Sequence, residues 1–156
     1  MILLGIDPGL ATTGFAFLEK ENREVKLLDF GILRTLPTTP LGERLTMIRE
    51  DLQELIDKYN PVAAGIEELF FSTNTKTALV VAHARGVLLE TLSYNNLEIH
   101  EFTPPEVKSA VTGDGRADKK QIQDMVRLIL GVEISPTFDD AADAVAVALC
   151  LSGLIR

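Results

Sequence analysis

Residues 1–14 read MILLGIDPGLATTG, an apolar run that ends on one carboxylate, Asp7, and continues into a Pro-Gly turn. Residues 2–6 leave no polar face, which predicts a central strand covered on both sides of a sheet. The turn and the alternating pattern of residues 12–18 predict an antiparallel partner. Asp7 would then lie at the rim of the sheet, opposite a cation side chain, backbone donors or a metal ion. A purely turn-forming role for Asp7 is the alternative that this stretch leaves open.

The remaining periodicity predicts three more strands and several helices in an α/β order. The further strands are expected over residues 25–33, 62–66 and 97–102, and helices over residues 41–59, 75–94 and 106–111, from residue 118, and from residue 139. The first three strands form an antiparallel meander, with Gly31 as a possible bulge. The fourth strand follows a helix, which favours parallel pairing with the first.

Composition indicates a soluble protein with one core and narrows its partners. The length of 156 residues suits a single domain. Fifteen basic against 23 acidic residues give a net charge of −8, which argues against generic nucleic-acid affinity but leaves room for a local basic patch. Cys150 is the sole cysteine, so no disulfide framework forms, in keeping with a reducing cytoplasm. Neither a signal peptide nor a stretch long enough to cross a membrane is expected.

Three more carboxylates are candidates for the same site as Asp7. Glu67 ends the strand that is expected to lie beside the first, which predicts both acids at one sheet edge. Asp140 and Asp143 are three residues apart in the last helix and share a face. Helix capping explains acids in a first turn, but it explains Asp143 poorly, because the helix around it is apolar. Like charges buried together are costly without a cation.

These acids offer hard oxygen ligands only, with no cysteine or histidine near them in sequence. Such a set suits Mg²⁺, with Mn²⁺ as a plausible substitute, rather than zinc. Four carboxylates can hold two ions ~4 Å apart, an arrangement used for in-line attack on phosphodiesters. Carboxylates that face separate regions, or that lysine or arginine already neutralises, would contradict this interpretation.

Other residues suggest contacts with DNA or with a second subunit. Phe70 and Phe71 are adjacent and cannot both face one core, so one of them is a candidate for stacking on a base. The densest basic set surrounds a glycine loop and suits either phosphate contact or a solvated face; it comprises Lys108, Arg116, Lys119, Lys120 and Arg127. The helix over residues 75–94 is apolar on more than one face, which favours packing on a second subunit. Its Arg85-Gly86 pair indicates a close backbone approach.

Several of these motifs, in this order, resemble the RuvC family of bacterial Holliday junction resolvases. The resemblance runs almost the full length and rests on Gly5-Ile6-Asp7-Pro8-Gly9, Thr13-Gly14, Ile66-Glu67 with Phe70, Ala84-Arg85-Gly86-Val87, Val107-Lys108, Lys119 with residues 121–126, and Asp140-Ala141-Ala142-Asp143-Ala144. It implies one RNase H-like nuclease domain over residues 1–156. The implied α/β fold has a mixed five-stranded sheet, three antiparallel strands and then two parallel ones, flanked by helices.

The resemblance also implies a function. A homodimer would nick opposite strands of four-way junction DNA at two metal sites, each with two Mg²⁺, and would work alongside the RuvA–RuvB branch-migration complex. Asp7, Glu67, Asp140 and Asp143 match the family's metal-binding acids, Phe70 its stacking aromatic, and Lys108 and Lys119 its DNA-contacting lysines. Two features depart from expectation: the net charge is strongly acidic, and Glu68 and Asp139 are extra acids beside the matched ones.

Three rival interpretations remain. The Asp7-Pro8-Gly9 turn with Thr12-Thr13-Gly14 resembles the first phosphate loop of actin-type and sugar-kinase ATPases, but those proteins need two such domains. A nuclease of the YqgF group shares the opening motif, whereas Asp140, Asp143 and the lysine loop favour RuvC. A junction-binding dimer without cleavage is disfavoured because all four acids are present.

Overall fold

The computed structural model describes residues 1–69, 75–133 and 139–155. Its strands are β1 (Ile2–Asp7), β2 (Thr12–Glu21), β3 (Glu24–Arg34), β4 (Ala63–Glu67) and β5 (Glu98–Phe102). Its helices are α1 (Leu41–Tyr59), α2 (Thr75–Tyr94), α3 (Pro104–Thr112), α4 (Lys119–Leu130) and α5 (Asp139–Leu154). The α/β order expected from the sequence is confirmed.

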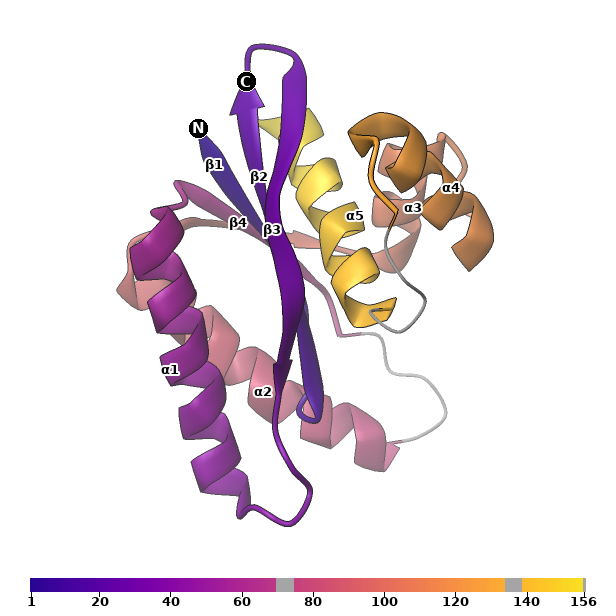
Figure 1. The fold of residues 1–156 in the computed structure, drawn as a ribbon. Coiled ribbons are helices and arrows are strands. Elements are labelled where there is room, and N and C mark those ends of the chain that lie inside the picture. The colour runs from indigo at the N-terminus through magenta and orange to yellow at the C-terminus, as the bar shows by residue number, and fades with distance from the viewer. Residues whose placement is uncertain (70–74, 134–138, 156) are drawn as a thin grey trace.

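The five strands form one mixed sheet in the order β3-β2-β1-β4-β5, as Figure 1 shows. The pairs β1–β2 and β2–β3 are antiparallel, whereas β1–β4 and β4–β5 are parallel. β1 is therefore central, as its apolar run predicts. Because β1 and β4 run in the same direction and Ile6 pairs with Ile66, Asp7 and Glu67 emerge at the same edge of the sheet.

Helices cover both faces of the sheet, with α1 and α2 on one side and α5, flanked by α3 and α4, on the other (Figure 1). The alternation of side chains along β1 divides the core in two. Leu3 belongs to the cluster under α5, whereas Leu4 and Ile6 belong to the cluster under α1 and α2. All three side chains are fully buried. This double cover explains why β1 has no polar face.

Glycines allow α5 to lie directly on the strands that lead to Asp7. A Cβ placed on Gly5 would come within 2.2 Å of the carbonyl oxygen of Ala144. A Cβ placed on Gly14, which pairs with Asp7 across the ladder, would come within 1.9 Å of the carbonyl oxygen of Asp140. Backbone contact of this kind fixes the first turn of α5 beside the end of β1.

Two local expectations about glycines were wrong. The irregularity of the β2–β3 ladder lies between Phe17 and Leu18 rather than at Gly31, whose missing side chain instead leaves room for the ring of Phe15. A Cβ on Gly86 would meet nothing within 4 Å, so this glycine makes no close approach within the described chain.

Among the described helices, none combines the length and apolar character that a membrane crossing requires.

Candidate metal centre

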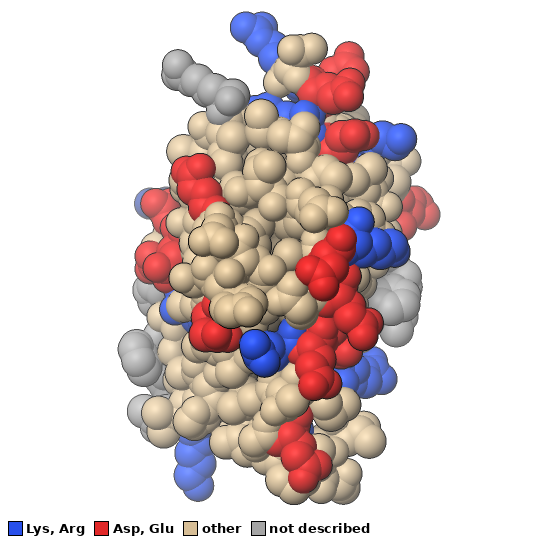
Figure 2. Space-filling view, turned by 90° about the vertical axis from the view of Figure 1, so that its left-hand side faces the viewer, with Lys and Arg blue, Asp and Glu red and all other residues tan. Residues whose placement is uncertain are grey.

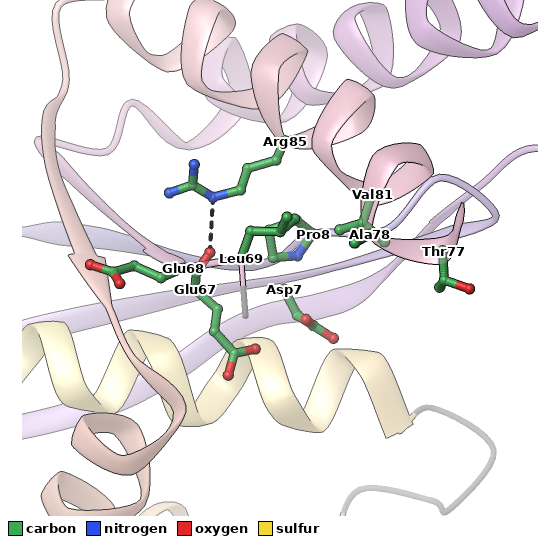
Figure 3. Close-up of a pocket in the computed structure, with 9 residues that line it drawn as sticks. All are labelled: Asp7, Pro8, Glu67, Glu68, Leu69, Thr77, Ala78, Val81 and Arg85. Carbon is green, nitrogen blue, oxygen red and sulfur yellow. Dashed lines mark hydrogen bonds between the residues drawn. The ribbon is translucent and has the colours of Figure 1, made fainter. Parts of the chain in front are cut away.

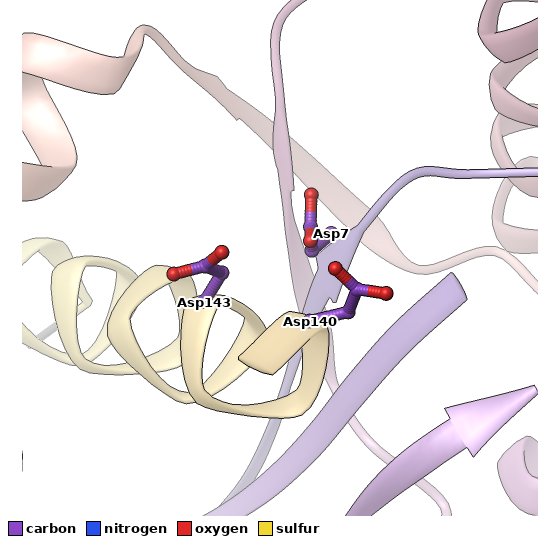
Figure 4. A group of neighbouring side chains, drawn as sticks. All are labelled: Asp7, Asp140 and Asp143. Carbon is purple, nitrogen blue, oxygen red and sulfur yellow. The ribbon is translucent and has the colours of Figure 1, made fainter. Parts of the chain in front are cut away.

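Three carboxylates converge where the first turns of α5 meet the end of β1 (Figure 4). Asp7, Asp140 and Asp143 each offer one oxygen, and these oxygens all lie within 4.8 Å of one another. The buried apolar residues of β1 fix that strand in the sheet, which places Asp7 at its end. The first turns of α5 present Asp140 and Asp143 from one face of the helix. Carboxylates from distant parts of the sequence therefore meet at one point, as the sequence predicts.

Glu67, the fourth candidate, lies outside that group of three but lines a cavity together with Asp143. Figure 3 shows the side chains of Asp7 and Glu67 leaving neighbouring strand ends toward α5, whereas the Glu68 carboxylate points away. The guanidinium of Arg85 donates from Nε to the carbonyl oxygen of Glu67 at 3.1 Å and also pairs with Glu101. This contact from α2 holds the end of β4 in place.

Burial and crowding of like charge raise the pKa of three of these acids, Asp7, Glu67 and Asp143. Burial, with the charges of Asp143, Glu67 and Asp140, raises the pKa of Asp7 to about 8. Burial also raises the pKa of Glu67, helped by Asp143, although Lys108 opposes the shift. The pKa of Asp143 is likewise raised by burial. A cation bound among these groups would remove the repulsion, so the donor set fits a divalent metal ion.

Lysine neutralises only part of this cluster. Nζ of Lys119 lies 3.2 Å from Oδ2 of Asp143 and also pairs with Asp139. The Lys119 side chain is 49% exposed, and among the described residues it is the only cation hydrogen-bonded to a carboxylate of the four candidate acids. One lysine cannot balance four carboxylates. Lysine therefore does not neutralise the four carboxylates fully, and the metal-site interpretation is not contradicted on this ground.

Lys119 and Lys108 line a cavity of about 250 Å³ beside the acids, together with Glu67 and Asp143. A capping box begins α4 and fixes Lys119 as its first residue. The backbone N–H of Gln121 donates to Oδ1 of Asp118 at 2.9 Å, and the backbone N–H of Asp118 donates to Oε1 of Gln121 at 2.8 Å. The basic set thus divides into Lys108 and Lys119, which line this cavity, and the basic residues that do not.

Arg116 and Lys120 are exposed and line none of the cavities at the acids. Arg127 pairs with Glu133 at 3.1 Å. Phe70 and Phe71, the stacking candidates, lie outside the described residues.

Sequence reasoning missed Thr12, whose hydroxyl donates a hydrogen bond to Oδ2 of Asp140. The residue lies in the opening motif, but its alternation indicates only a strand. The contact with Asp140 depends on the register of β2 against β1 and on the docking of α5, and no sequence pattern indicates either.

The raised pKa of Asp7 predicts how stability depends on pH in metal-free protein. The folded state retains a proton that the unfolded chain, with its ordinary pKa of 3.8, has lost, so stability should fall as pH rises from about 4 to about 8. Each unit of pKa difference corresponds to about 1.4 kcal/mol. Thermal melting across this range should show the fall, Asp7→Asn should reduce it, and saturating Mg²⁺ should reduce it too. Equal pH dependence with and without Mg²⁺ would contradict the prediction.

Known proteins resemble the chain over almost all of its length. The sequence model of the family described as crossover junction endodeoxyribonuclease RuvC matches residues 3–151. Crossover junction endodeoxyribonucleases RuvC of Alkaliphilus metalliredigens and Alkaliphilus oremlandii are 49% and 51% identical over 150 residues, which is 96% of this chain and 92% of each relative.

Solved structures give the same picture. Thermus thermophilus RuvC in complex with a Holliday junction substrate superimposes with a TM-score of 0.90 at 32% identity, covering 96% of this chain and 92% of that one. A yeast mitochondrial Holliday junction resolvase, at 16% identity and a TM-score of 0.72, shares the fold. The RNase H-like α/β fold implied by the sequence resemblance is thus confirmed.

Proposed function

The chain belongs to the RuvC family of crossover junction endodeoxyribonucleases, and on this premise we propose that it resolves Holliday junctions in DNA recombination and repair. It makes paired, symmetric, metal-dependent nicks in a four-way junction. The observation that carries the proposal is the convergence of Asp7, Asp140 and Asp143 within 4.8 Å, with Glu67 lining a cavity beside Asp143. Family membership excludes the YqgF and ATPase alternatives.

Asp7, Glu67, Asp140 and Asp143 are the proposed ligands of two Mg²⁺ ions, for which Mn²⁺ is a substitute. Their hard oxygens and their mutual repulsion support this assignment. Such ions, when bound, supply an activated water and a counter-charge for the leaving oxygen of a phosphodiester. The chain itself contributes a rigid frame: β1 and α5 fix three of the acids, and Arg85 holds the backbone of Glu67.

The proposed DNA contacts surround the acids. Lys108 and Lys119 line the same cavity as Glu67 and Asp143, which supports the proposal that they hold phosphates next to the reacting one. Arg116 and Lys120 extend this grip on the exposed side of α4. Phe70 is proposed to stack on a base near the scissile step, by its match to the family. A local grip of this kind accounts for DNA binding by a chain whose net charge is −8.

Lys119→Ala is expected to weaken junction binding and to make it less dependent on salt. Loss of one phosphate contact reduces the slope of log K against log salt by about one. Titrations of labelled junction at several salt concentrations, without metal, measure this slope. Lys26→Ala, at the opposite end of the sheet on β3, is the matched control and should leave it unchanged. An unchanged slope in Lys119→Ala would make Lys119 a partner of the acids only.

The outer face of α2 is the proposed homodimer interface. Leu79 and Val80 are 61% and 42% exposed, although large apolar side chains of a helix are usually buried. Beside them, a groove of about 460 Å³ between α1 and α2 includes the exposed Gly86. Figure 2 shows that the centre of the face that includes α1 carries little charge, with acidic side chains on both sides of it. An apolar patch with a charged rim is typical of an interface between protein chains.

Leu79→Glu is therefore expected to convert a dimer into monomers, because the new carboxylate would be buried against the partner. Light scattering coupled to size-exclusion chromatography measures the mass. Leu128→Glu is the matched control, since Leu128 is 75% exposed on α4 and away from α2. A dimer that survives Leu79→Glu would place the interface elsewhere.

Two further elements of the proposal come from the family. The resolvase is proposed to act on junctions handled by the RuvA–RuvB branch-migration complex. A DNA substrate and a buried, unpaired Cys150 fit the cytoplasmic location expected from the sequence.

Incubation of labelled four-way junction and of matched linear duplex, with and without Mg²⁺, tests the function. We expect symmetric nicks in the junction alone, only with Mg²⁺, and ligatable products. Binding of the junction without cutting under any divalent metal would favour the junction-binding alternative. Equal cutting of duplex would remove the structural specificity.

A further inference from the structure

Thr12 lies outside the set of acids and basic residues discussed above, yet it touches one of the acids directly. Its hydroxyl donates a hydrogen bond to Oδ2 of Asp140. We propose that Thr12 is a positioning residue that fixes the Asp140 carboxylate in the orientation needed to bind a divalent cation. This inference rests on the proposed function, because it takes Asp140 to be a metal ligand.

β2 holds Asp140 at two points. The backbone of Asp140 rests against Gly14, where a Cβ would come within 1.9 Å of its carbonyl oxygen. Two residues earlier on the same strand, Thr12 holds one carboxylate oxygen. Since Gly14 pairs with Asp7, this strand relates the two acids to each other. Oδ1 of Asp140 is left without a protein donor among the described residues, and it is therefore available to a cation.

Thr12 is itself firmly placed. It pairs with Arg34 at the start of the β2–β3 ladder. The turn that precedes it is tied to Thr35, whose backbone N–H donates to the carbonyl oxygen of Ala11 at 3.0 Å and whose hydroxyl donates to that of Leu10 at 2.6 Å. Arg44 in turn donates to the Thr35 hydroxyl at 2.8 Å. A short side chain on such a support has little freedom to swing away from Asp140.

The contact differs in kind from the one between Lys119 and Asp143. Lys119 is a half-exposed, flexible cation that competes with a bound metal for the same negative charge. Thr12 is a neutral donor, so its hydrogen bond does not oppose a divalent ion and can persist when the site is loaded. Outer partners that orient a ligand in this way commonly change metal affinity or activity by about 10–100-fold.

Two variants at this position separate the hydroxyl from the methyl group. Thr12→Val retains the shape and suits a strand, but it cannot donate to Asp140. Thr12→Ser retains the donor and loses the methyl. Mn²⁺ binding to metal-free protein without DNA, followed by electron paramagnetic resonance, should be about 10-fold weaker in Thr12→Val and close to wild type in Thr12→Ser. Thermal melting checks that both variants are folded.

Asp140→Asn separates failure of this inference from failure of the proposed function. If Asp140→Asn binds Mn²⁺ as the wild type does, Asp140 is not a ligand and the proposed function itself is wrong at this residue. If Asp140→Asn loses binding while Thr12→Val does not, only the positioning role is overturned. Equal weakening in Thr12→Val and Thr12→Ser would also overturn it, because packing rather than the hydroxyl would then matter. In the Asp140→Asn background, adding Thr12→Val should have no further effect.

Discussion

Asp7→Asn is expected to abolish cutting of four-way junctions at saturating Mg²⁺ while leaving junction binding largely intact. Asp7 is central to the cluster, since Asp143, Glu67 and Asp140 all act on its pKa. Asparagine has nearly the same shape but lacks the negative charge that a divalent ion requires. Loss of about 4 kcal/mol of metal-assisted stabilisation lowers a rate by about 1,000-fold. Single-turnover cutting and a binding titration on the same labelled junction measure the two effects.

A matched substitution guards against a trivial cause. Asp57→Asn changes an exposed aspartate of α1 and should retain full cutting. Full activity in Asp7→Asn would remove Asp7 from the mechanism. Loss of binding and cutting together would instead indicate that Asp7 supports the fold or the DNA contact, not the chemistry.

Gly14→Ala is expected to damage both stability and activity. A methyl group at this position would come within 1.9 Å of the carbonyl oxygen of Asp140 and 2.5 Å of its carbonyl carbon. The neighbour is helix backbone, so relief requires α5 to move off β2, and Asp140 moves with it. Overpacking against backbone should cost about 3 kcal/mol of the free energy of unfolding. Urea unfolding measures this cost, and cutting should be lost even where the variant is folded.

Gly42→Ala provides the control for that experiment. Gly42 lies in the first turn of α1, and a Cβ there would meet nothing within 4 Å. In a helix, alanine is favoured over glycine by about 1 kcal/mol, so this variant should be as stable as the wild type or slightly more so. An unfolding midpoint for Gly14→Ala equal to that of the wild type would contradict the close contact between β2 and α5.

The framework of the site could be predicted because it follows from periodicity and strand polarity. An acid follows each of the apolar runs 2–6 and 62–66, and the helix that precedes the second run favours parallel pairing with the first. That is sufficient to bring Asp7 and Glu67 to one edge. The three-residue spacing of Asp140 and Asp143 likewise puts both on one face of α5.

The remaining features depend on tertiary contacts that have no local signature. Thr12 reaches Asp140 only because α5 rests on Gly14, and this contact joins residues from opposite ends of the sequence. Alternation indicates that Thr12 is in a strand, but not what lies beside it. Gly31 illustrates the opposite error: a glycine in a strand suggested a bulge, whereas it makes room for Phe15.

The central claim is that carboxylates from β1, β4 and α5 share one metal site, and cleavage of the protein by site-bound iron tests it most directly. Fe²⁺ is added to metal-free protein in place of Mg²⁺. Ascorbate and peroxide then generate radicals at the bound iron, and these radicals cut the backbone near the ion. The account predicts cuts near Asp7, Glu67 and Asp140 together, all suppressed by excess Mg²⁺. Cuts confined to one of these segments, or spread over the chain and insensitive to Mg²⁺, would contradict it.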